Sequence, residues 1–281
     1  MAFPRLSPRV TQGLALALLW LLTAATVGVL LFIVIFVLRR GLPEIDTAFL
    51  SEGPRDMGRA GGILPMVVGT LYVTLVAVVV ATPLGLGTAI YLTEYTREGW
   101  LTRIVRFGAE CLAGVPSIIF GLFGFVFFVI TLGMGWSVLA GGLTLAFMIL
   151  PTVIRTAEEA IKSVPASYRE VSYTLGASKW QTILKVVLPS ALPGIATGLI
   201  LGIGRSISET AAVIFTAGSS LKMPLSLFDP ARTMSVHFYL LAREGISMPK
   251  AYATAAVLVI AILAINVTAY VLMNRFMRRY R

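Results

Sequence analysis

Residues 168–176 read Tyr168-Arg169-Glu170-Val171-Ser172-Tyr173-Thr174-Leu175-Gly176, a short charged stretch between two long apolar segments. Pro165 suits the first turn of a helix and Gly176 suits its end, so the stretch predicts a helix of about three turns. Leu188-Pro189 then opens the next apolar segment. The pattern predicts a compact polar loop that a soluble partner can hold.

The rest of the chain is unusually apolar. It has 281 residues, of which 57% are hydrophobic and 13% are charged, whereas soluble domains are about 45–50% apolar and about 25% charged. A bilayer core needs roughly 20 helical residues to cross. The 44 residues at 111–154 are too many for one span and carry Gly133-Met134-Gly135 near their middle, so they predict a hairpin of two spans. The other uncharged runs supply one span each: 10–38, 60–93, 186–204 and 251–274.

We therefore expect an all-α polytopic membrane protein with six transmembrane helices. A β-barrel is disfavoured because barrel strands are about ten residues long and alternate apolar with polar side chains. The first span follows Arg5 and Arg9, but it is too long for a secretory signal and no small-residue cleavage site follows it. It is therefore predicted to be a retained anchor.

The charges of the loops predict the orientation. Six spans place both termini on one side, together with the loops at 93–110 and 155–185. This side receives fourteen of the 23 Lys and Arg residues and six of the 13 acidic residues. Arg39-Arg40 argues locally for the opposite orientation, but the basic residues at 275–281 outweigh it. Because Lys and Arg are in excess on the cytoplasmic side, both termini are predicted to be cytoplasmic in an inner-membrane, multi-pass protein.

Several function classes lose support. The basic residues are spread over loops and form no long patch, so contact with anionic lipid explains them better than nucleic acid does. No lysine follows a glycine, which excludes a Walker A loop, and His237 is the sole histidine, which removes a His-pair zinc site. Cys111 permits no internal disulfide and is expected to be a small buried residue. We expect no catalytic residue, metal or cofactor, and hence not an enzyme.

The polar loop resembles the EAA loop of ABC importer permeases, the binding-protein-dependent transport components of MetI-like fold. That pattern runs Glu-Ala-Ala, three residues, Gly, nine residues, then Ile-x-Leu-Pro. Here Val171 and Ser172 replace two alanines, and Val186 replaces the isoleucine. The resemblance implies a type I ABC importer permease that couples to an ATPase through this loop. The coupling residues are then Arg169, Glu170, Val171, Ser172, Gly176, Leu188 and Pro189.

A narrower resemblance covers roughly residues 63–273. The phosphate-importer permeases are similar at VGTLYVTL (68–75), LGTAIYLTEY (86–95), LAGVPSIIFGLFG (112–124) and GRSISETAA (204–212). Residues 231–244, ARTMSVHFYLLARE, resemble the PstA member rather than its partner PstC. Ser206 and Ser208 depart from the expected Ala and Gly. The domains implied are an anchor helix with an extracytoplasmic loop (1–62), the permease domain (63–273) and a basic cytoplasmic tail (274–281).

The resemblance also implies partners. These are a PstC-like second permease, a PstB-like ATPase dimer, a PstS-like extracytoplasmic phosphate-binding protein and inorganic phosphate as substrate. Membrane lipid is a further partner, and nucleic acid is not. Permeases for sulfate, molybdate, amino acids or other small solutes, and the PstC-type subunit, stay open as alternatives. A channel or proton-coupled carrier that works alone is less favoured, because the spans are nearly free of carboxylates.

The fifth span carries two further features. Gly194, Gly198 and Gly202 recur at four-residue spacing, which predicts close packing against a neighbouring span or, alternatively, a lining of the pathway. Arg205 and Glu209 are predicted on the same helix, one turn apart, with Arg205 roughly 24 Å past Pro189. Such a pair in or near the membrane predicts a gate for the anion pathway, and a snorkelling arginine at the membrane edge is the alternative.

Overall fold

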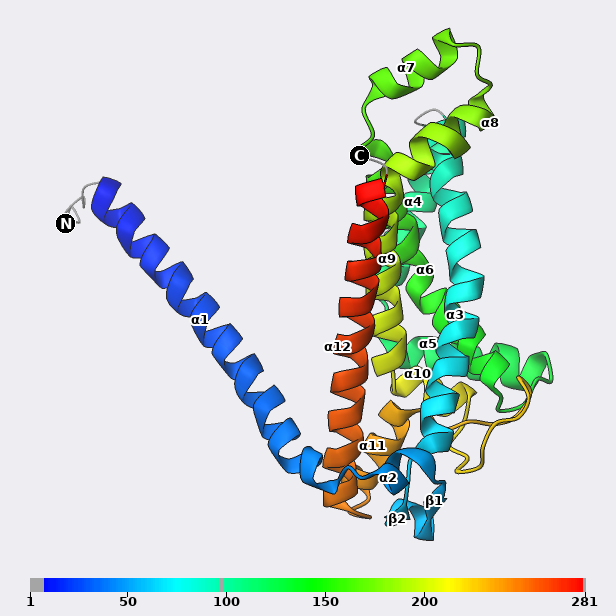
Figure 1. The fold of residues 1–281 in the computed structure, drawn as a ribbon. Coiled ribbons are helices and arrows are strands. Elements are labelled where there is room, and N and C mark those ends of the chain that lie inside the picture. Colours follow the sequence, from blue (N-terminus) through cyan, green and yellow to red (C-terminus); the bar gives the residue numbers. More distant parts are fainter. Residues whose placement is uncertain (1–7, 97–98, 280–281) are drawn as a thin grey trace, which may run out of the picture.

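The computed structural model describes residues 8–96 and 99–279, and its described elements are helices apart from one two-stranded hairpin (Figure 1). The hairpin pairs β1 (Pro54–Arg55) with antiparallel β2 (Ala60–Gly61). The α-helices are α1 (Pro8–Gly41), α2 (Thr47–Ser51), α3 (Leu64–Ile90), α4 (Trp100–Ala113), α5 (Ser117–Gly124), α6 (Val138–Lys162), α7 (Ala166–Thr174), α8 (Lys179–Thr182), α9 (Leu188–Ser208), α10 (Ala211–Thr216), α11 (Met234–Arg243) and α12 (Met248–Arg279). Single-turn elements are the 3₁₀ turns η1 (Leu42–Glu44) and η2 (Asp56–Gly58) and the π-helical turns η3 (Tyr91–Tyr95), η4 (Phe125–Thr131) and η5 (Ile183–Val187). The all-α prediction is confirmed.

Two ends of the bundle are distinct. We call residues 163–187, which include α7 and α8, the arm, and residues 217–245, which include α11, the cap. The arm and the cap lie at opposite ends of the long helices, and the last turns of α12 lie at the arm end (Figure 1). The hairpin β1–β2 lies at the cap end (Figure 1). The long helices between them are the candidate spans.

Five unbroken segments of the described residues are long and apolar enough to cross a membrane: Thr11–Glu44, Leu64–Tyr95, Val138–Lys162, Lys179–Ser208 and Met248–Val271. The sixth candidate is a broken pair, Thr102–Ala113 and Ser117–Thr131, which is bent by 101°. Of the two spans predicted in residues 111–154, only the second, which corresponds to α6, is therefore an unbroken helix. The turn itself is where it was predicted, with Gly133 and Gly135 at φ +65° and +63°.

The break in the sixth candidate has a local cause. α4 ends at Ala113, and α5 starts at Ser117 after Pro116. Proline pushes the preceding residue away from the helical region and cannot donate a backbone hydrogen bond. Cys111 lies in the last turn of α4 and is exposed, so its predicted burial is wrong.

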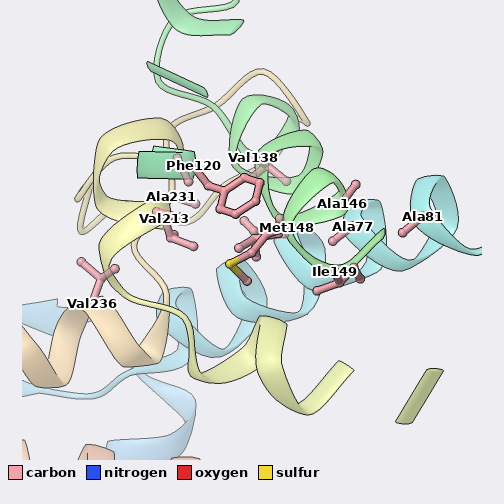
Figure 2. Close-up of a cluster of buried hydrophobic side chains, with 14 residues drawn as sticks. Ala77, Ala81, Phe120, Val138, Ala146, Met148, Ile149, Val213, Ala231 and Val236 are labelled. Atoms are coloured by element: carbon pink, nitrogen blue, oxygen red, sulfur yellow. The ribbon is translucent and has the colours of Figure 1, made fainter. Parts of the chain in front are cut away.

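The centre of the bundle is the close pair α3 and α6. A Cβ at Gly142 of α6 would lie 2.4 Å from Cγ1 of Val76, and one at Gly85 of α3 would lie 2.7 Å from Cγ1 of Val153. Only glycine permits these approaches, as is usual for helices packed in lipid. Buried side chains from α3, α5, α6, α10 and α11 fill the region around this pair (Figure 2).

The first helix leaves the bundle. α1 leans away from the other helices along most of its length and reaches them only near its end (Figure 1). There the ring of Phe36 meets the edge of Tyr252, with 5.8 Å between ring centroids. α12 runs without a break to Arg279, so the predicted boundary between residues 273 and 274 coincides with no end of a helix. Residues 280–281 of the predicted tail, and Arg5, lie outside the described residues.

Candidate functional site

The first helix of the arm, α7, has well-formed ends. Pro165 immediately precedes α7, and Gly176 follows its end with φ +82°. The amide of Gly176 donates to the carbonyl of Tyr173 (2.9 Å), and the amide of Ala177 donates to that of Ser172 (3.1 Å). This arrangement terminates a helix through a left-handed residue, as the sequence predicted for Gly176.

Arg169 ties the arm to the bundle. Its guanidinium donates twice to Oε1 of Glu94, from Nε at 3.0 Å and from Nη2 at 2.7 Å. It also donates to the backbone carbonyls of Val164 (2.8 Å) and Ile161 (3.1 Å). Three segments therefore meet at one side chain: η3 at the end of α3, the end of α6, and α7. The sequence placed Arg169 in the coupling loop, but it gave no partner for it.

The remaining predicted arm residues divide by exposure. Ser172 is the buried residue of α7, and its hydroxyl lies 2.9 Å from that of Thr182 in α8. Glu170, Val171 and Gly176 are exposed. Leu188 and Pro189 are half-buried at the start of α9. Among the residues that the sequence assigned to coupling, Arg169 therefore binds the bundle and Ser172 binds α8. The exposed residues are available to a partner.

The outward surface of the arm carries large apolar side chains. Its exposed members on α7, α8 and the turn between them are Tyr168, Val171, Tyr173, Leu175 and Trp180. Leu175 is 83% exposed. A groove of about 530 Å³ next to them is lined by residues that include Tyr168, Lys185 and Pro189. Clustered apolar groups rimmed by polar residues mark interaction surfaces.

The glycines of the fifth span lie against α6. A Cβ at Gly194 would lie 2.6 Å from Cβ of Ala160, and one at Gly198 would lie 1.9 Å from Oγ1 of Thr156. Gly202 has more room, with Cδ1 of Ile149 at 3.6 Å. The geometry therefore places Gly194 and Gly198 at a tight helix–helix contact.

The prediction that Arg205 and Glu209 share one helix is wrong. α9 ends at Ser208, and Glu209 has extended backbone angles (φ −72°, ψ 131°). Oε1 of Glu209 accepts from the amide of Ala212 at the start of α10 (3.3 Å), and its carbonyl accepts from the hydroxyl of Ser235 in the cap (2.6 Å). Arg205 is exposed in the last turn of α9. Contact with the cap turns the chain at Glu209, which the local sequence does not reveal.

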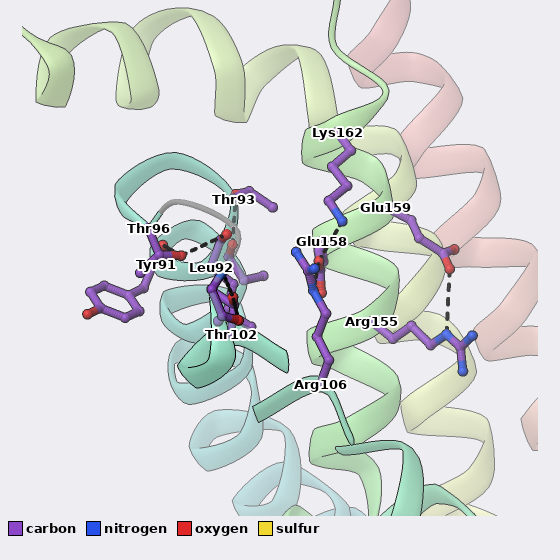
Figure 3. A network of polar contacts seen from close by, with 12 residues as sticks. Tyr91, Leu92, Thr93, Thr96, Thr102, Arg106, Arg155, Glu158, Glu159 and Lys162 are labelled. Atoms are coloured by element: carbon purple, nitrogen blue, oxygen red, sulfur yellow. Dashed lines mark hydrogen bonds and ion pairs between the residues drawn. The ribbon is translucent and has the colours of Figure 1, made fainter. Parts of the chain in front are cut away.

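A charged network that the sequence did not predict lies between α4 and α6. Oε1 of Glu158 lies 2.7 Å from Nε of Arg106 and 2.7 Å from Nζ of Lys162 (Figure 3). Arg155 and Glu159 form a neighbouring, more exposed pair at 3.6 Å (Figure 3). These side chains line a cavity of about 460 Å³. Glu158 and Lys162, like Arg155 and Glu159, are four residues apart, and this helical spacing is the sequence signal for these pairs.

The cap contains a second buried cluster. Nη1 of Arg232 donates to Nδ1 of His237 (3.4 Å), and Nε of Arg232 donates to the carbonyl of Ser219 (2.9 Å). Burial, and then the charge of Arg232, lowers the pKa of His237 to about 4. Burial also lowers the pKa of Arg232. Within the described residues, no group of three His, Cys, Asp or Glu side chains could hold a metal ion.

Comparison with known protein families identifies the family of this chain. The family described as "Binding-protein-dependent transport system inner membrane component" matches residues 81–281. The chain belongs to this family. It is an inner-membrane, multi-pass subunit of an ABC importer, a permease rather than a catalytic chain. Permeases of this kind pair with ATPase subunits and a binding protein.

Individual relatives agree. The chain is 33% identical to the "Probable ABC transporter permease protein YqgI" of Bacillus subtilis over 93% of this chain and 94% of that protein. It is 39% identical to "Phosphate transport system permease protein PstA 1" of Mycobacterium tuberculosis, over 79% of this chain and 73% of that protein. Its fold is similar to a chain of the MetNI methionine ABC transporter in an inward-facing conformation, with TM-score 0.64 and 21% identity over 76% of this chain and 95% of that chain. This likeness supports the MetI-like fold alone.

Proposed function

We propose that the chain is the PstA-type permease of an ATP-driven importer of inorganic phosphate. The observation that carries the proposal is the 39% identity to a PstA 1 permease over 79% of the chain. The proposed partners are a PstC-like permease, a PstB-like ATPase dimer and a PstS-like binding protein. The chain supplies half of the translocation pathway and no nucleotide site of its own.

The arm is the proposed binding site for the ATPase. Docking covers the exposed apolar side chains around Val171 and Leu175, and such burial stabilises a complex by about 25 cal/mol per Å² before the costs of association. Glu170 is exposed beside them and is free to accept hydrogen bonds from a partner. The arm is therefore proposed to face the cytoplasm and the cap to face the outside of the cell.

Arg205 is the proposed contact for the passing anion. It is exposed in the last turn of α9, at the end opposite the arm. A guanidinium recognises phosphate oxygens through paired, charge-assisted hydrogen bonds. In this conformation the carboxylate of Glu209 accepts a hydrogen bond from the amide of Ala212 at the start of α10. A gate that joins Glu209 to Arg205 therefore requires the start of α10 to release the carboxylate.

Reconstitution tests the proposal. The four components in proteoliposomes, with ATP on the side of the ATPase, are expected to take up labelled phosphate, and the permease alone is expected to take up none. Arg205→Gln is expected to abolish uptake in a complex that still assembles and hydrolyses ATP. Sulfate uptake at the same rate as phosphate, or uptake by the chain alone, would contradict the proposal.

Labelling tests the orientation. In a variant that lacks Cys111, Ser51→Cys is expected to react with an impermeant thiol reagent added outside the cell. Ser178→Cys, at the start of α8, is expected to react only after the membrane is opened. The reverse pattern would overturn the assignment of the arm to the cytoplasm.

A further inference from the structure

Glu94 is a buried carboxylate at the point where the core helix α3 meets the arm. It belongs to η3, the π-helical turn that ends the α3 span, and its side chain is 7% exposed. Its partner Arg169 is 19% exposed and comes from α7, 75 residues later in the sequence. The pair is therefore a long-range tie between a span and the arm.

The geometry of this tie favours a positioning role. A buried ion pair contributes little net stability, because desolvation offsets most of the attraction, but it fixes the relative placement of the groups that carry it. Arg169 makes four hydrogen bonds, two to one carboxylate oxygen and two to carbonyls near the end of α6. These bonds restrain both the distance and the angle between α7 and α3.

A second contact holds the arm to the same turn. Nζ of Lys179, the first residue of α8, lies 4.9 Å from the ring centroid of Tyr95. The turn η3 therefore receives both short helices of the arm, α7 through Glu94 and α8 through Tyr95. Most of the other side chains of α7 are exposed, so the pair with Glu94 is the main side-chain contact that orients α7 against α3.

The other end of α3 contacts the cap. Oγ1 of Thr70 accepts from the amide of Met234, and a Cβ at Gly69 would lie 3.0 Å from the carbonyl oxygen of Arg232. Ser235 of the cap in turn binds the carbonyl of Glu209 at the end of α9. α3 with η3 thus contacts the arm at one end and the cap near the other, and the cap in turn binds Glu209, which follows α9.

We propose that Glu94 is a positioning residue for transport: paired with Arg169, it transmits movement of the docked arm to α3. The proposal rests on the proposed docking of the ATPase on the arm. It separates two tasks within the loop. The exposed surface around Val171 and Leu175 binds the ATPase. The buried pair of Glu94 and Arg169 transmits the resulting movement of the arm to α3.

Charge exchange tests the proposal. Glu94→Arg and Arg169→Glu each leave an uncompensated charge in a buried place, and phosphate uptake by the four-component complex is expected to fall about tenfold, within the range of mutational effects on coupling. The ATPase is expected to remain bound and to hydrolyse ATP, so that less phosphate enters per ATP. The double variant E94R/R169E is expected to regain uptake.

A matched control uses the exposed pair Arg155 and Glu159, whose side chains are 63% and 70% exposed. Reversal of either charge there is expected to change uptake less than twofold, because exposed pairs contribute little. Normal uptake in both single variants at positions 94 and 169 would overturn the proposal. Loss of the ATPase from those variants would also overturn it, because the pair would then serve docking.

A second readout needs no substrate. Spin labels at Gly87→Cys on α3 and Tyr173→Cys on α7, in a chain without Cys111, report the distance between span and arm by pulsed electron resonance. A narrow distribution is expected for the intact pair, a broad one for Arg169→Glu and a narrow one again for E94R/R169E. An unchanged distribution in Arg169→Glu would overturn the proposal even if the importer carries another solute. Absence of phosphate uptake in the intact complex would overturn only the proposed function.

Discussion

The cap helix α11 and the arm helix α7 differ in how many of their side chains are buried. The cap helix α11 buries Met234, Ser235, Val236, His237 and Leu241, and its contacts reach α3, α10, α12 and the carbonyl of Glu209. The arm helix α7 buries only Ser172 among its nine residues and is tied to the bundle mainly through Arg169. Both are short helices at the ends of the same spans. They differ in how much of each is already covered by its own chain.

This difference separates stability from function. Removal of a fully buried side chain costs the transfer energy and leaves a cavity, whereas truncation of an exposed one changes stability little. Changes in the cap should therefore unfold the cap end of the bundle. Changes at the exposed residues of the arm should leave the fold intact and alter what the arm binds or transmits.

The largest effect is expected for Leu241→Ala in the cap. Leu241 is 0% exposed, and Leu to Ala at such sites costs about 2–5 kcal/mol. The variant should melt at a lower temperature in detergent, and α11 should exchange its amide hydrogens faster. An unchanged melting temperature would show that the cap packs less tightly than its burial implies.

The pH response of the cap is expected to be the next largest. The pKa of His237 is about 4, below the ordinary value of 6.5, so the folded state favours the neutral ring. The stability that this contributes is fully present above about pH 6.5 and falls as the pH is lowered toward 4. At pH 5 the loss is about 2 kcal/mol.

His237→Gln supplies the control for that response. His237 is the sole histidine, so the difference between the two proteins isolates its titration from that of the carboxylates. Thermal melts at pH 7.5 and pH 5 should show a smaller shift for the variant. Equal shifts would mean that the cap does not hold the ring neutral.

The sequence predicted the features that single segments determine. Uncharged runs of span length gave the long helices, because a bilayer fixes both the length and the composition of a helix that crosses it. Pro165 and Gly176 gave the ends of α7, because each acts on its local backbone. The break before Ser117 was missed because Gly114 and Pro116 lie within an uncharged run, where spans tolerate such residues.

Features that depend on distant contacts were not predictable in this way. Glu209 was placed on the fifth span because the residues after Gly204 contain no helix breaker, yet Ser235, 26 residues later, binds its carbonyl. The partner of Arg169 lies 75 residues away. The candidate site was therefore predicted residue by residue, without the contacts that join the arm to α3.

A smaller effect is expected for Ser172→Ala inside the arm. The hydroxyl pair between Ser172 and Thr182 is lost, but Thr182 still donates to the carbonyl of Ser178 (3.1 Å). With no buried group left unpaired, the cost is about 1 kcal/mol. Faster proteolysis within residues 163–187, with an unchanged global melting temperature, would show that the arm opens alone. Thr174→Ala, which removes an exposed hydroxyl, serves as the matched control.

The smallest effect on stability is expected for Leu175→Ala. The side chain is 83% exposed, so the free energy of unfolding should change by less than about 0.5 kcal/mol. If the arm docks on the ATPase, the affinity of the permease for the ATPase should nevertheless fall about fivefold or more, as for an anchor in an interface. Leu225→Ala is the matched control, because Leu225 is 86% exposed but lies in the cap. Equal affinity in both variants would remove Leu175 from the docking surface. A lower affinity in Leu225→Ala alone would place the ATPase at the wrong end and reverse the comparison of arm and cap.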